Sequence, residues 1–286
     1  MPNPKRNQTI AGRTYEVGEK KLPSVTTILS VIGKPALISW AASVEREMVL
    51  EASAALYIDA PEHPKLKRET WLATLLDRLG KDRASKKLME KAGDIGSQVH
   101  HYIEWIMRST LGQETGPEPV LLPAAKTAFL AWDEWRSEVK LTPVAIEQTV
   151  WSNEYGYAGT MDLAALIDGP LTATDYFTGE SKTIECNQAL AVMDWKSGKR
   201  IYPEAFLQNA AYRHAYREMG HGDPKLGLIV RLPKTDKDPS FEAMWCPPEE
   251  EAMENFLHAK KLWEWQQKHD KWLQEAIKKA EAVCQP

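Results

Sequence analysis

The sequence predicts an α/β protein with a helical N-terminal part and a helical C-terminal end. Helix-period apolar spacing dominates residues 24–139, and β-branched runs broken by one helix occupy residues 144–245. A charged helical pattern fills residues 248–283. This order of elements is typical of a sheet covered by helices. The chain of 286 residues is long enough to bury a core without needing a disulfide or a structural metal.

The N-terminal part is expected to be a short arm followed by helices. Residues 1–21 have little periodicity and predict a short strand or a loose arm. A helix is expected to begin within Pro23–Leu29, where Ser24 can cap its first turn, and Gly33-Lys34-Pro35 interrupts it. Further helices are expected at 36–55, at 69–91 with a break near Gly80, at 85–107 and, after a linker at 112–119, at 121–139.

The middle of the chain changes to strand patterns. Residues 144–152 and 157–167 flank the turn Asn153-Glu154-Tyr155-Gly156 and predict a hairpin. Residues 169–188 are polar and predict a turn-rich insertion. The remaining expected elements are a strand at 189–195, a helix at 203–219, strands at 226–232 and 241–245, and one or two helices over 248–283. The corresponding regions are an arm (1–21), a helical layer (22–140), a core (141–246) and a helical C-terminal region (247–286).

Composition excludes several classes of protein. The net charge of −4 argues against a surface coated in positive charge, although a local basic groove is still compatible with it. The eleven tryptophans are better explained by packing than by base stacking. Cys186, Cys246 and Cys284 are too far apart for a metal-binding Cys motif and suit a reducing cytosol. No signal-peptide or membrane-span pattern is present, so a cytoplasmic protein is expected.

The most informative motif is Asp194-Trp195-Lys196, at the end of a predicted strand. Other acid-x-Lys triplets lie at a helix end, in a turn or in the polar segment, where surface charge explains them. Strand alternation places Asp194 and Lys196 on one face and Trp195 on the other. Asp162 lies in another predicted strand. Two converging carboxylates are costly unless a cation or a proton neutralises them.

This arrangement favours phosphodiester hydrolysis. Carboxylates favour Mg²⁺ or Mn²⁺, and a neighbouring lysine can hold the attacking water. Two simpler interpretations remain open. Asp162 and Asp194 can cap loops or pair with Arg200, and Lys196 can form a structural ion pair with Asp194. A zinc hydrolase built on His100 and Glu104 is disfavoured because neither H-E-x-x-H nor H-x-x-E-H occurs there.

Four ordered motifs resemble the PD-(D/E)xK nuclease superfamily, specifically its RecB-like exonuclease branch of phage and bacterial type. The motifs are Gly93–His100 with Glu104, Gly159-Thr160-Met161-Asp162, Asp194-Trp195-Lys196-Ser197-Gly198, and Gln208-Asn209-Ala210-Ala211-Tyr212. The opening Pro23–Leu29 also looks like members of this branch. The resemblance covers about residues 22–232 and implies a restriction-endonuclease-like α/β/α core with a mixed central sheet, to which the sequence adds the N-terminal helical layer and the long C-terminal helix.

The resemblance also implies roles for individual residues. Asp162 and Asp194 would bind Mg²⁺ or Mn²⁺, with His100 and the backbone carbonyl of Trp195 as further ligands, and Lys196 would be the catalytic lysine. Glu147 and Glu104 are candidate acidic supports, the latter because i,i+4 spacing places it on the face of His100. His101 is expected to point away. Gln208 and Tyr212 would lie near the DNA, although packing and surface roles explain them almost as well. The charges of Lys199 and Arg200 make them further candidate DNA contacts, although a solvated face explains most of the basic residues.

The expected function is therefore metal-dependent DNA exonuclease activity in phage or bacterial recombination or repair. The substrate would be DNA with a free end, in the cytoplasm of a bacterial or phage-infected cell. No membrane is implied, and no iron–sulfur cluster is expected, because the four cysteines that hold one in many relatives are missing. A structure-specific endonuclease and a non-catalytic DNA-binding module of the same fold are the alternatives. The acidic net charge predicts a narrow, salt-sensitive basic channel.

Overall fold

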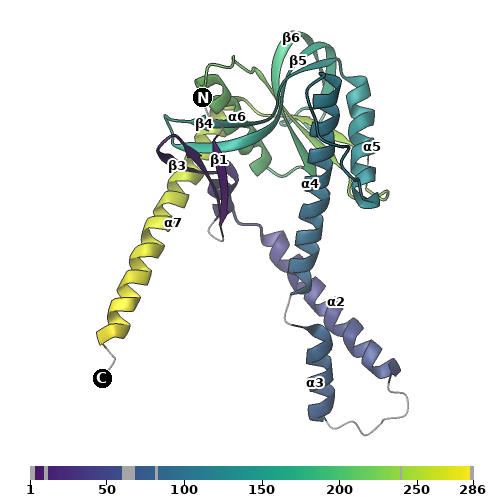
Figure 1. The fold of residues 1–286 in the computed structure, drawn as a ribbon, viewed down its shortest axis with the longest axis vertical. Coiled ribbons are helices and arrows are strands. Elements are labelled where there is room, and N and C mark those ends of the chain that lie inside the picture. Colours follow the sequence, from purple (N-terminus) through teal and green to yellow (C-terminus); the bar gives the residue numbers. More distant parts are fainter. Residues whose placement is uncertain (1–3, 10–11, 60–67, 81–82, 239, 284–286) are drawn as a thin grey trace. The chain divides into compact units, whose positions relative to one another are not determined.

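The computed structural model describes residues 4–9, 12–59, 68–80, 83–238 and 240–283, which fall into two compact units. Unit 1 contains the described residues of 1–32 and 98–286, and unit 2 spans 33–97 (Figure 1). Cys284 and the first three residues of the predicted arm lie outside the described ranges, within which Cys186 and Cys246 are free thiols. None of the helices in these ranges has both the length and the apolar character needed to cross a membrane.

Unit 2 is helical, as the sequence predicts for this segment. It contains α2 (Pro35–Asp59), α3 (Arg68–Leu79) and the first half of α4 (Ala84–Thr110). The predicted helix at 69–91 ends at Gly80, whose φ of +68° favours glycine, and its last residues belong to α4. The Glu45 carboxylate caps α4 by accepting from the backbone N–H of Ser85 at 3.0 Å and from the Ser85 hydroxyl at 2.6 Å.

Unit 1 is built on a mixed five-stranded sheet. The strands β4 (Leu141–Ser152), β5 (Tyr157–Thr174), β6 (Ser181–Ser197), β7 (Leu226–Leu232) and β8 (Glu242–Trp245) are adjacent in chain order. Only the β6–β7 pairing is parallel among these neighbours, and α6 (Glu204–Glu218) makes the crossover that a parallel pair requires. The mixed α/β class predicted from the sequence is confirmed.

Two segments differ from the sequence prediction. The expected turn-rich insertion at 169–188 is mostly strand, because β5 and β6 continue as one long hairpin and leave only 175–180 as its turn. Thr172 opposes Thr183 there, with their hydroxyls 2.7 Å apart, so the polar composition reflects an exposed hairpin face. The N-terminal arm forms a three-stranded antiparallel sheet of β1 (Lys5–Thr9), β2 (Gly12–Val17) and β3 (Lys20–Pro23).

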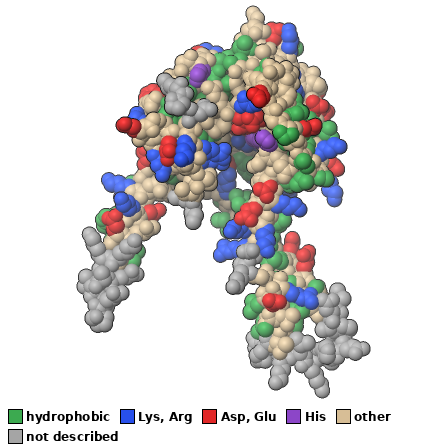
Figure 2. Space-filling view, in the orientation of Figure 1, with side chains coloured by type: hydrophobic (Ala, Val, Ile, Leu, Met, Phe, Trp, Pro, Cys, Tyr) green, Lys and Arg blue, Asp and Glu red, His purple; other side chains and the backbone are tan. Residues whose placement is uncertain are grey.

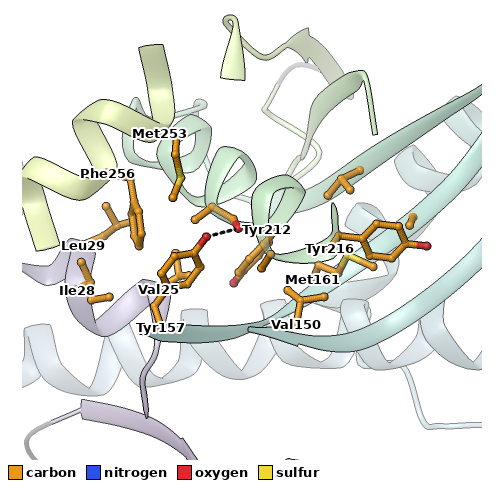
Figure 3. Packing of buried hydrophobic residues seen from close by; sticks show 14 residues of the cluster. Val25, Ile28, Leu29, Val150, Tyr157, Met161, Tyr212, Tyr216, Met253 and Phe256 are labelled. Atoms are coloured by element: carbon orange, nitrogen blue, oxygen red, sulfur yellow. Dashed lines mark hydrogen bonds between the residues drawn. The ribbon is translucent and has the colours of Figure 1, made fainter. Parts of the chain in front are cut away.

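Helices cover both faces of the central sheet. On one face, α1 (Val25–Ile28), η1 (Leu29–Val31), α6 and the single long helix α7 (Glu249–Val283) enclose the core drawn in Figure 3. Tyr157 donates a hydrogen bond of 2.9 Å to the Ala211 carbonyl inside it. Ser24 caps α1 as predicted, accepting from the Thr27 N–H at 3.0 Å.

The other face is covered by α5 (Pro123–Glu138). Val192 belongs to the core beneath α6, so Trp195, an odd number of residues later on β6, points to the opposite face. There its ring contacts Trp132 and Trp135, with centroids 6.3 and 5.3 Å away. The packing interpretation of the tryptophans is confirmed for these three, and the sheet lies between α6 and α5.

Candidate active site

Three acidic residues form one row across neighbouring strands. The pairings Ile146↔Leu163 and Gln148↔Met161 on either side place Glu147 of β4 opposite Asp162 of β5. The pairing Leu163↔Met193 makes Asp194 of β6 the next residue in the row. Opposed residues in an antiparallel pair have Cβ atoms about 5 Å apart, so the register alone concentrates three carboxylates.

His100 reaches this row from α4. The apolar residues Val99, Ile103 and Met107 are buried, which fixes one face of the C-terminal half of α4 within unit 1. His100 Nδ1 lies 3.4 Å from Asp162 Oδ1 and 3.8 Å from Glu147 Oε1. Ligand atoms of His100, Glu147 and Asp162 all lie within 4.8 Å of one another, and we call this trio the strand cluster.

The backbone at Glu147 is unusual. Its φ of +46° is in the left-handed region, which costs a non-glycine residue about 1–3 kcal/mol when it occurs in a strand. Arg108 of α4 donates from Nη2 to the carbonyl of the preceding residue, Ile146, at 2.8 Å. The same guanidinium donates from Nε to Glu104 at 2.9 Å. Arg108 therefore holds the segment that presents Glu147, a function that no sequence motif indicated.

The electrostatics of the strand cluster are those of excess negative charge. Burial favours neutral His100, but the carboxylates of Asp162 and Glu147 outweigh it and raise its pKa to about 10. Burial also opposes ionisation of Asp162, yet the charge of His100 leaves that pKa below its usual value. The pKa of Glu147 is raised by burial and by the neighbouring Asp162 carboxylate.

Asp194 and Lys196 form a close ion pair beside the strand cluster. Asp194 is 1% exposed, and burial followed by repulsion from Asp162 raises its pKa to about 6, against the opposing effect of Lys196. Burial would lower the pKa of Lys196, but the charges of Asp194 and Asp162 raise it. The ammonium is therefore charged at neutral pH. Lys196 and a protonated His100 do not balance the three acids, and a divalent cation that displaces the His100 proton would complete the balance.

The two oxygens of Asp162 have separate partners. Oδ2 accepts a hydrogen bond of 2.7 Å from the backbone N–H of Trp195, which leaves Oδ1 directed at His100. Arg200, the alternative partner for the aspartates, instead lies over the Tyr202 ring, 4.7 Å from its centroid. The role of the Trp195 carbonyl as a ligand stays a prediction.

The other residues predicted for the site differ in how far they are buried. Glu104 pairs with Arg108, which in turn donates to the Ile146 carbonyl beside Glu147. Oε2 of Glu104 lies 3.7 Å from Nδ1 of the exposed His101. Tyr212 is a core residue, 2% exposed, whose hydroxyl accepts from Gln208 at 2.8 Å. Burial and the charges of Asp194 and Asp162 raise the Tyr212 pKa, which places the phenol near the acids. Lys199 and Arg200 are exposed just beyond β6.

The donor set fits a divalent cation. Buried carboxylate oxygens with one imidazole nitrogen are ligands for Mg²⁺ or Mn²⁺, and their mutual repulsion is what a cation relieves. On the face drawn in Figure 2, basic and acidic side chains are interspersed over the surface. Comparisons of the sequence with known protein families and with curated proteins found no match.

Proposed function

We propose that this chain is a Mg²⁺- or Mn²⁺-dependent deoxyribonuclease with a restriction-endonuclease-like α/β/α core and an N-terminal helical layer. The observation that carries the proposal is the convergence of Glu147, Asp162 and Asp194, from three adjacent strands, with His100 and Lys196. A chain that only binds DNA has no need to gather three acids, two of them buried, around one lysine. The cytoplasm of a bacterial or phage-infected cell is the proposed location.

Each residue of the candidate active site has a separate proposed role. Asp162 Oδ1, Glu147, Asp194 and His100 would hold the cation, which when bound acidifies a water and stabilises charge on the phosphate. Lys196 is charged and its side chain is 31% exposed, so its ammonium can hold the attacking water and the anionic phosphate oxygens. Asp194 keeps that ammonium in place. The Trp195 N–H fixes the rotamer of Asp162 and thereby the direction of its free oxygen.

Exonuclease activity is the preferred form of this function, on the strength of the motif resemblance. An exonuclease needs an end, so degradation of linear but not circular DNA supports it. Cleavage of circular single-stranded or branched DNA favours the structure-specific endonuclease instead. Lys199, Arg200 and Gln208 are the proposed DNA contacts, and binding through them should weaken with salt.

The test is Mn²⁺-dependent degradation of linear DNA by the wild-type chain and by Asp194→Ala and Lys196→Ala. We expect both variants to lose activity by roughly 10²-fold or more, because Asp194→Ala removes a ligand of the cation and Lys196→Ala removes the ammonium that faces the phosphate. The ion pair of Lys140 and Asp168 supplies matched surface controls, and Lys140→Gln and Asp168→Asn should keep full activity. Full activity in Asp194→Ala and Lys196→Ala overturns the proposal, as does a wild-type chain that binds DNA but never cleaves it.

A further inference from the structure

A second group of metal-ligating side chains lies in unit 1, outside the candidate active site. Glu154 is in the turn between β4 and β5, and His214 and Glu218 are one turn apart on α6. Ligand atoms of the three lie within 4.8 Å of one another. We call this group the turn cluster. Sequence reasoning missed it, although the i,i+4 spacing of His214 and Glu218 on one helix face is visible in the sequence.

The imidazole of His214 presents an unsatisfied nitrogen to two carboxylates. Nε2 lies 3.6 Å from Glu218 Oε2 and 3.8 Å from Glu154 Oε2. This nitrogen is inaccessible to solvent and has no hydrogen-bond partner among the described residues. The distances are too long for hydrogen bonds, so a buried polar atom faces two oxygens with a gap between them.

The glutamates are oriented by the backbone of the turn. Glu218 Oε1 accepts from the N–H groups of Asn153 and Glu154, at 2.7 and 3.2 Å, which leaves Oε2 for His214. The ring of Tyr155 packs on the imidazole, with centroids 5.0 Å apart. The pKa of Tyr155 is raised by its hydrogen bond to Glu154, which ties that carboxylate to the same turn. The carboxylate of Glu218 is thus held in place before any ion arrives.

We propose that the turn cluster is a zinc site that joins the β4–β5 turn to α6. One imidazole nitrogen and two carboxylate oxygens are a ligand set that Zn²⁺ accepts, with a solvent molecule as the fourth ligand. Tetrahedral bonds of about 2.0–2.2 Å separate ligand atoms by roughly 3.3–3.6 Å. The two distances from His214 Nε2 exceed this range by at most a few tenths of an ångström, and the glutamate oxygens lie within 4.8 Å of each other, so closing of the exposed Glu154 side chain forms the site. Glu154 is 58% exposed, which gives the ion a route of entry.

The turn cluster differs from the strand cluster in its surroundings. Among the described residues no lysine is paired with Glu154 or Glu218, so the group lacks the cation that accompanies the strand cluster. The competing interpretation is a protonated His214 that forms ion pairs with both glutamates and binds no metal. The proposal does not rest on nuclease activity.

The experiment is a titration of the metal-free full chain with ZnCl₂, carried out on the wild-type chain and on Glu147→Gln, which removes a donor of the strand cluster. We expect both chains to bind a zinc equivalent at the turn cluster and to melt at a higher temperature with zinc. His214→Asn and Glu218→Gln should weaken zinc binding at least about 100-fold, since removing a ligand costs more than removing a group behind it. His269→Asn, on the exposed part of α7, and Glu147→Gln should keep the zinc equivalent.

A second variant keeps the test usable if the first one does not fold. If His214→Asn does not fold, Glu154→Gln replaces it, because an exposed turn residue is easily substituted. Titration with Co²⁺ adds a spectroscopic test, and the intense visible absorption of a tetrahedral site is expected from the wild-type chain alone. Zinc uptake that is unchanged in His214→Asn or Glu154→Gln, or no uptake by the wild-type chain, overturns the proposal and leaves the ion-pair interpretation.

Discussion

The strand cluster and the turn cluster use the same donor types, one imidazole and two carboxylates, in different surroundings. In the strand cluster Asp162 is 8% exposed, and a charged lysine and a third acid lie beside it. In the turn cluster Glu154 is 58% exposed and backbone N–H groups orient Glu218. Buried acids beside a charged lysine are suited to stabilising the charge of a transition state. An exposed cluster that includes a turn residue is suited to cross-linking the turn to a helix. Donor identity alone does not distinguish the two roles.

The largest expected effect is a loss of DNA degradation when the strand cluster, but not the turn cluster, is altered. Asp162→Asn should lower Mn²⁺-dependent DNA degradation by roughly 10²–10³-fold, because it removes an anionic ligand while its amide oxygen can still accept from Trp195. Glu218→Gln, the matched change in the turn cluster, should leave activity within about twofold. Initial rates on linear duplex DNA measure both. Equal losses of activity in the two variants would contradict a catalytic role confined to the strand cluster.

The second prediction concerns metal-linked stability. Mn²⁺ at about 100 times its Kd should stabilise unit 1 by about 2.7 kcal/mol, because the ion binds only the folded site. Glu147→Gln should reduce this gain by more than half, since it removes one of the three donors of the strand cluster. Thermal unfolding with and without Mn²⁺ measures the gain, and Asp168→Asn serves as the acidic control. A full Mn²⁺ gain in Glu147→Gln would place the ion elsewhere.

The third prediction tests the contact between the two elements that carry the clusters. A Cβ on Gly159 of β5 would lie 2.4 Å from Cε1 of Tyr212 on α6. Gly159→Ala should therefore destabilise the chain by about 1–3 kcal/mol through overpacking. Urea unfolding gives the difference, and Gly116→Ala, where nothing lies within 4 Å of the added Cβ, is the control. A neutral Gly159→Ala would mean that α6 is free to shift on β5.

The smallest expected effect concerns Arg108. Arg108→Ala should reduce activity about tenfold and weaken Mn²⁺ binding, because the carbonyl of Ile146 loses the donor that holds the Glu147 segment. Arg108→Lys should recover part of the loss, as one donor can still reach that carbonyl. The Mn²⁺ concentration for half-maximal rate is the decisive measurement. A loss in rate with unchanged Mn²⁺ dependence contradicts a positioning role.

Local pattern was sufficient for most elements. The apolar spacing around Val99 and Ile103 predicts the helix that carries His100, and alternation predicts that Asp194 and Lys196 share a face, as their ion pair confirms. The long β5–β6 hairpin is not predicted because Gly169 and Pro170 interrupt the strand pattern, although Leu171 and Ala173 beyond them alternate as buried residues with exposed Thr172. In such a segment the pairing register between the two strands decides whether it forms a hairpin or a loop.

The sequence by itself determined the mixed α/β class, the strand that ends in Asp194-Trp195-Lys196 and the helix that bears His100, because hydrophobic period and strand alternation are local properties. Only the tertiary structure decided which acids meet. The register of β4, β5 and β6 aligns Glu147 with Asp162 and Asp194, and the packing of α6 against the β4–β5 turn brings His214 to Glu154. Both contacts join residues distant in the chain, and long-range pairing has no signature in local periodicity.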